Sequence, residues 1–178
     1  MAAGFEILPG LPSSGPLPEQ FSATGHGTHS EGFVVRFLPE ESSPWVGNFQ
    51  GGFGECQGVF AHPNGCHFIV VATGQAYIVD PESRALLHHF GADIASVMEV
   101  PEIDALVFTN GLWFEAHGAS GHLWRSQRVS WDGVRSLSRT ELTLQGEAYS
   151  PLDDAWHPFS LDLASGHTQG GSYNGPLR

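Results

Sequence analysis

The segment from Val59 to Phe90 constrains the fold of this chain more than any other stretch. It holds three short apolar runs, at 68–72, 76–79 and 85–90, with turn-forming sequences before and between them. One of these turns is Asn64-Gly65, a pair that favours a two-residue hairpin turn. Short β-branched runs separated by such turns are typical of antiparallel strands. The segment therefore predicts an antiparallel β meander.

The rest of the chain continues this pattern and adds no helical signal. No segment shows a sustained 3.6-residue apolar period with capping residues, so an all-β protein with little or no helix is expected. Residues 1–30 are rich in proline and glycine and are predicted to form an N-terminal strap. Residues 31–178 are predicted to form a single all-β domain, since 178 residues suit one domain.

Turn-containing segments also recur along the sequence at similar intervals. If Ser43, Arg84, Gly121 and Gly166 are taken as equivalent turn positions, they are 41, 37 and 45 residues apart. A strand-turn-strand unit that repeats about every 40 residues is the pattern of propeller blades.

One part of the chain also resembles a known family. Val59-Phe60-Ala61-His62-Pro63-Asn64-Gly65, followed by Tyr77-Ile78-Val79-Asp80, resembles the blades of YVTN and WD-type β-propellers. This resemblance implies a propeller-like arrangement of hairpin repeats. The alternative is a β-sandwich or β-roll, in which similar turns occur because few turn chemistries are available.

The charge of the chain limits its partners. A formal net charge of −12 argues against binding to nucleic acid or to an anionic membrane, because both require a basic face. It permits a protein partner with a basic surface. The chain has no secretory signal pattern and no apolar run of about 20 residues. The predicted hairpin also separates Cys56 from Cys66, so two free thiols in the cytoplasm are expected.

Histidines near two turns are the candidates for metal binding. The Asn64-Gly65 turn places His62 opposite His67, and the turn at residues 118–121 places His117 opposite His122. Cross-strand neighbours have Cβ atoms about 5 Å apart, close enough for two imidazoles to share a metal. A zinc site needs a third ligand, and neither turn supplies an obvious one apart from Cys66 or Glu115, so no cofactor is predicted.

The sequence also lacks the usual catalytic motifs. It contains no GxSxG, no P-loop and no GxGxxG that opens a helix. No catalytic residues are therefore assigned.

Arginines and aromatic residues gather in one part of the sequence. Four of the seven basic residues fall between Arg125 and Arg139. Arginine beside tryptophan is a common composition for an interface anchor. The predicted binding surface consists of Trp113, Trp124, Arg125, Arg128, Trp131 and Asp132. The alternative is that these arginines pair with the surplus carboxylates. The same asymmetry of charge permits self-association.

These observations favour a non-catalytic cytoplasmic binding or interaction module whose ligand is unknown. One alternative is an acidic inhibitor or immunity-type protein that binds a basic partner. The other is a metal-dependent enzyme that uses histidines from separate turns.

Overall fold

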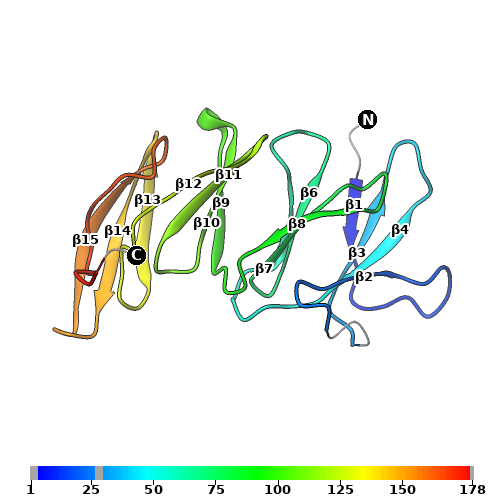
Figure 1. The fold of residues 1–178 in the computed structure, drawn as a ribbon, viewed down its shortest axis with the longest axis horizontal. Helices are drawn as coiled ribbons and strands as arrows, with labels where there is room; N and C mark the ends of the chain where they lie inside the picture. The colour runs from blue at the N-terminus through cyan, green and yellow to red at the C-terminus, as the bar shows by residue number, and fades with distance from the viewer. Residues whose placement is uncertain (1–3, 27–29, 177–178) are drawn as a thin grey trace. The chain divides into compact units, whose positions relative to one another are not determined.

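The protein is all-β. The computed structural model describes residues 4–26 and 30–176. These residues form sixteen strands and one short 3-10 helix, Pro101–Ile103, and the strands make four four-stranded sheets (Figure 1). The prediction of an all-β protein with little helix is confirmed. Within the described ranges, no helix has the length and apolar character needed to cross a membrane.

The chain divides into two compact units, the first ending at Ile94 and the second beginning at Ala95. The first sheet of the first unit has the order β1-β3-β4-β2. Its strands are β1 (Gly4–Ile7), β2 (Glu19–Phe21), β3 (Phe33–Leu38) and β4 (Trp45–Phe49). Strand β2 pairs with β4 in parallel, whereas the other pairs are antiparallel.

Both outer strands of this sheet come from the segment predicted to be a strap. Residues 1–3 and 27–29 of that segment lie outside the described residues. The single domain over residues 31–178 stays a prediction.

The second sheet is the meander predicted for the segment from Val59 to Phe90. Its strands follow one another in the order β5 (Gly58–Ala61), β6 (Phe68–Ala72), β7 (Gln75–Val79) and β8 (Leu86–Phe90). Every residue of β6 and β7 is buried, whereas β8 is largely exposed. The two inner strands are covered on both faces, which explains why their sequences are continuous apolar runs.

Aromatic side chains fill the core of the first unit. Phe37 stacks on Trp45 with 4.5 Å between ring centroids, and Phe49 contacts Tyr77 of the second sheet at 5.5 Å. The indole N–H of Trp45 donates a hydrogen bond of 2.8 Å to the carbonyl of Pro81. The core therefore joins the two sheets of this unit through both packing and directed polar contacts.

The second unit also contains two sheets. The third sheet has the order β12-β11-β10-β9, from β9 (Ser96–Val100), β10 (Ala105–Thr109), β11 (Phe114–Gly118) and β12 (Gly121–Arg125). The fourth follows the order of the chain, with β13 (Val134–Thr140), β14 (Thr143–Ser150), β15 (Ala155–Asp162) and β16 (Thr168–Gly170). Buried apolar residues from both sheets, including Phe114, Leu144 and Leu161, form one core cluster.

A glycine-rich loop at residues 51–54 connects the two sheets of the first unit. The amides of Gly52 and Gly54 donate to the carbonyls of Ala72 and Thr73, both at 3.0 Å. The amide of Phe53 donates to the carbonyl of Ala92 at 2.6 Å. Main chain lies so close to this loop that a Cβ on either glycine would clash with a carbonyl group. The loop backbone is therefore fixed on two neighbouring segments.

Gly54→Ala is expected to lower the free energy of unfolding by about 1–3 kcal/mol, because the added methyl group would collide with the main chain at Ile94. Gly4→Ala is the matched control, since a Cβ there would meet Leu38 at an ordinary distance of 3.7 Å. Urea denaturation of both variants measures the difference. A Gly54→Ala variant as stable as the wild type would contradict the close approach.

Candidate functional site

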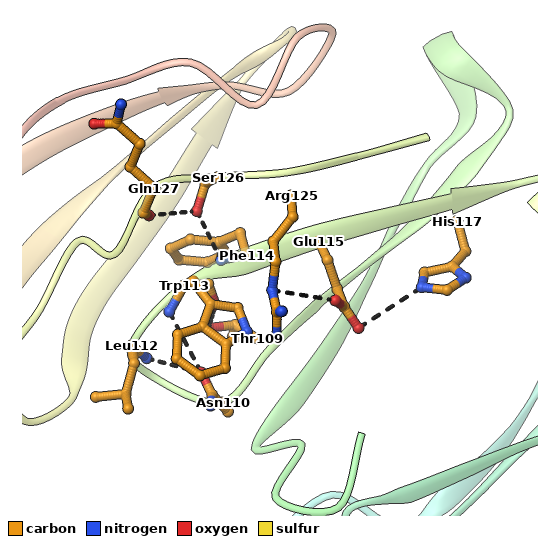
Figure 2. A network of polar contacts seen from close by, with 10 residues as sticks. All are labelled: Thr109, Asn110, Leu112, Trp113, Phe114, Glu115, His117, Arg125, Ser126 and Gln127. Atoms are coloured by element: carbon orange, nitrogen blue, oxygen red, sulfur yellow. Dashed lines mark hydrogen bonds and ion pairs between the residues drawn. The ribbon is translucent and has the colours of Figure 1, made fainter. Parts of the chain in front are cut away.

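The third sheet carries a network of polar and aromatic side chains on β11 and β12 (Figure 2). His117 pairs with His122 as the turn predicts, but the register then shifts, and Glu115 pairs with Arg125. The shift leaves Leu123 as an extra residue in β12, which makes it the bulged position. The bulge is therefore what brings a carboxylate and a guanidinium opposite each other.

The turn that leads into β11 orients Trp113. The side-chain carbonyl of Asn110 accepts hydrogen bonds from the amides of Leu112 and Trp113, at 3.0 and 3.3 Å. The hydroxyl of Thr109 donates to the carbonyl of Trp113 at 2.7 Å. Gly111 has a positive φ of 84°, a conformation that glycine adopts without strain. These contacts fix the main chain from which the indole projects.

Arg125 is the exposed centre of the network. Its guanidinium carbon lies 4.4 Å from the centre of the Trp113 ring, and its Nε lies 3.5 Å from Oε2 of Glu115. The side chain of Arg125 is 52% exposed, whereas that of Glu115 is 16% exposed. A cation over an exposed tryptophan ring contributes about 0.5–1 kcal/mol. The guanidinium is thus held in place on a side chain that is half exposed to solvent.

Glu115 also contacts a buried histidine on the other side. Its Oε1 lies 3.7 Å from Nε2 of His117. His117 is buried, and its ring packs edge-on against Phe108 and His122, with centroid distances of 5.5 and 5.4 Å. The network therefore runs from the protein interior at His117 to the surface at Arg125 (Figure 2).

The pKa of Glu115 is lowered by its neighbours. Burial opposes ionisation of this carboxyl, but the nearby His117 imidazole and the positive charge of Arg125 outweigh it and lower the pKa of Glu115. The lowered pKa keeps Glu115 ionised, so its carboxylate attracts and orients the guanidinium of Arg125.

Ser126 has a structural role beside this network. Its hydroxyl accepts from the amide of Phe114 at 2.9 Å and donates to the carbonyl of Gln127 at 2.8 Å. The first bond joins the residue that follows β12 to the start of β11, and the second fixes the orientation of the hydroxyl. The guanidinium of Arg125, held between Trp113 and Glu115, therefore suits the binding of a carbonyl or carboxylate group.

Trp124 belongs to the interior instead of this surface. Its indole N–H donates a hydrogen bond of 3.0 Å to the carbonyl of Leu163, and its ring packs against Gly166. It is partly buried against the core cluster of the second unit. The structure thus separates Trp124 from its sequence neighbour Arg125.

Arg128, Trp131 and Asp132 lie in the connection between β12 and β13. Arg128 donates to the carbonyls of Ser130 and Trp131, at 2.8 and 2.9 Å. Its guanidinium carbon lies 4.7 Å from the Tyr173 ring and 5.6 Å from the Trp131 ring. Asp132 is exposed at the turn. Arg128 therefore holds this connection in shape. Tyr173 takes part in this contact and was missed by sequence reasoning, because a C-terminal coil segment carries no pairing signal.

The other hairpin with paired histidines is also ordered by hydrogen bonds. The ring centroids of His62 and His67 lie 5.8 Å apart. The backbone amide of Asn64 donates to Nδ1 of His62 at 3.2 Å, and its side-chain amide contacts Nδ1 of His67 at 2.8 Å. In residues 4–26 and 30–176, no group of three or more histidine, cysteine, aspartate or glutamate side chains is placed to hold a metal ion. The pairing of His62 with His67 and of His117 with His122 therefore produces contacts between rings.

Comparisons with known proteins add little. No protein-family model and no curated protein match this chain. A solved structure described as "Crystal structure of the eukaryotic initiation factor" is similar, with a TM-score of 0.40 and 12% sequence identity. The match covers 81% of this chain and 40% of that one, so this chain spans less than half of its length. No argument rests on this likeness.

Glu115→Gln is expected to weaken the dependence of stability on pH in acid. A carboxyl whose pKa is lowered by folding contributes its full stabilisation above the unfolded pKa of about 4.3, and this contribution is lost as the pH falls through the folded pKa. The wild type should therefore lose more stability than Glu115→Gln between about pH 5 and pH 3.

Urea denaturation midpoints over this range measure the effect. Glu99→Gln removes an exposed carboxylate from β9 of the same sheet, so it separates the network from a change of net charge. If Glu115→Gln follows the wild-type curve throughout, the network does not hold Glu115 ionised.

Proposed function

We propose that this chain is a non-catalytic binding module that recognises a protein partner through a surface centred on Arg125 and Trp113. The observation that carries the proposal is the position of Arg125, stacked at 4.4 Å on Trp113 and half exposed. Arginine and tryptophan are enriched among the residues that dominate binding energy at interfaces. A side chain that is already ordered loses less conformational entropy on binding.

The chemistry of this surface suggests which groups it contacts. The guanidinium is a planar donor that matches carboxylate and carbonyl oxygens, and the indole offers apolar area beside it. Glu115 is a carboxylate of low exposure, so it keeps the guanidinium oriented without covering it. We propose that the partner places a carbonyl or carboxylate group on Arg125.

The net charge of −12 favours a partner that is basic over the rest of its surface. An inhibitor-type role against a basic protein is the second candidate, and this charge is the observation that favours it. Such a complex would form faster at low salt than at high salt. The two candidate pairs, His62 with His67 and His117 with His122, gain no third ligand in the described residues, so we do not propose a metal-dependent enzyme.

We also propose that the four sheets are blades of the propeller type. In support, each sheet has four strands, and the second, third and fourth sheets follow the order of the chain. A cytoplasmic location is part of this proposal. It is supported by two free cysteines, Cys56 and Cys66, which suit a reducing compartment.

Arg125→Ala is expected to reduce recovery of the partner at least about tenfold when the tagged full chain is purified from its native cells. Arg125→Lys should restore little, because lysine neither stacks nor donates in a planar fork. Quantitative mass spectrometry of the recovered proteins measures the loss, and thermal unfolding confirms that each variant is folded.

Arg135→Ala is the matched control. Arg135 repeats the arrangement on the fourth sheet, with its guanidinium 4.0 Å from the Trp156 ring and 2.9 Å from Glu147. The side chain of Arg135 is also half exposed, but its carboxylate partner Glu147 is 37% exposed, whereas Glu115 is 16% exposed. The proposal fails if Arg125→Ala recovers the same proteins as the wild type, or if both variants lose them equally.

A further inference from the structure

The two most exposed large apolar side chains of the described residues both lie in the first unit. Phe53 is 91% exposed and Leu17 is 92% exposed. Phe53 is the one side chain larger than hydrogen in the loop at residues 51–54, and the backbone of this loop is fixed by hydrogen bonds to two neighbouring segments. Because the backbone of this loop is already ordered, it loses little conformational entropy if the phenyl ring contacts another surface.

Leu17 lies on the rim of a pocket elsewhere in this unit. The pocket has a volume of about 210 Å³, and its walls include Pro12, Pro16, Leu17 and Trp45. An apolar cavity of about 150 Å³ binds benzene, so this pocket is large enough to admit a phenyl ring. The pocket therefore offers apolar walls of the kind that Phe53 requires.

The charges around the two features are complementary. Glu55 and Asp93 are exposed, and each is close in sequence to the Phe53 loop or to the Ala92 carbonyl that holds it. The pocket is lined by Arg36 and Arg84, which are the only basic residues in the sequence between residues 1 and 94.

Each pocket arginine forms an ion pair with a glutamate on one of the two outer strands of the first sheet. Arg36 pairs with Glu6 of β1 at 2.7 Å, and Arg84 pairs with Glu19 of β2 at 3.8 Å. Both arginine side chains stay about 40% exposed. They can therefore contact a carboxylate that arrives with an inserted ring.

We propose that Phe53 of one copy of this chain inserts into the pocket of a second copy, in a head-to-tail contact. The contact buries the two most exposed apolar side chains together and brings Glu55 and Asp93 of one copy to Arg36 and Arg84 of the other. Its two surfaces differ, so a pair of copies still has one free tip and one free pocket, and the assembly closes into a ring or continues to grow. The contact is independent of the surface around Arg125.

Sedimentation velocity of the full chain tests the proposal. Protein concentrations up to about 1 mM are needed, because a contact made by one inserted ring and a few charges is weak. The wild type is expected to self-associate with increasing concentration. Phe53→Ser removes the tip, and Leu17→Glu removes an apolar wall and repels the incoming carboxylates. Each should weaken self-association at least about tenfold while leaving thermal unfolding unchanged, since both side chains are more than nine-tenths exposed.

Mixing the two variants gives the sharpest result. The Phe53→Ser copy keeps an intact pocket and the Leu17→Glu copy keeps an intact tip, so a 1:1 mixture should form a dimer that grows no further. Leu152→Ser removes a 70% exposed apolar side chain in the second unit and should associate like the wild type. A wild type that stays monomeric, association that survives either variant, or a mixture without dimers overturns the proposal.

Discussion

A β-bulge at Leu123 determines which side chains meet on the third sheet. Without it, the ladder from the preceding turn would continue with Trp124 opposite Glu115. The extra residue shifts the register by one, so Arg125 takes that place and reaches the Trp113 ring. Because successive residues of a strand point to opposite faces, the same shift directs Trp124 to the interior. One inserted residue thus places the cation on the surface and the neighbouring indole in the core.

The contact between arginine and an aromatic ring recurs in the second unit with different consequences. Arg128 uses its ring contacts together with main-chain carbonyls, so its guanidinium stabilises a connection between strands. Arg135 lies on Trp156, beside a carboxylate that is itself solvent-exposed. Arg125 differs because a buried network supports its carboxylate. Among the described residues, Arg84, Arg125, Arg128 and Arg135 each lie over an aromatic ring, the last three in the second unit, and they differ in the groups that hold them there.

The parts of the fold that follow local rules were predictable from the sequence. The meander between Val59 and Phe90 was predicted because the Asn64-Gly65 turn and the continuous apolar runs are local signals. The same turn fixed the pairing of His62 with His67. The outer strands of the first sheet were not predicted, because residues 1–30 are rich in proline and become strands only by pairing with distant partners. The cross-strand pairing of Glu115 with Arg125 was also not predicted, because a bulge has no reliable local sequence signature.

The stacking of Arg125 on Trp113 in the free protein is the basis of the proposed recognition surface, and NMR measures it most directly. Side-chain protons held over the face of an indole ring resonate upfield of their ordinary positions. Such shifts are expected for the Arg125 side chain in the wild type and should disappear in Trp113→Leu. Ordinary shifts for Arg125 in the folded wild-type protein would contradict this expectation and show that the guanidinium is not held on the ring before a partner binds.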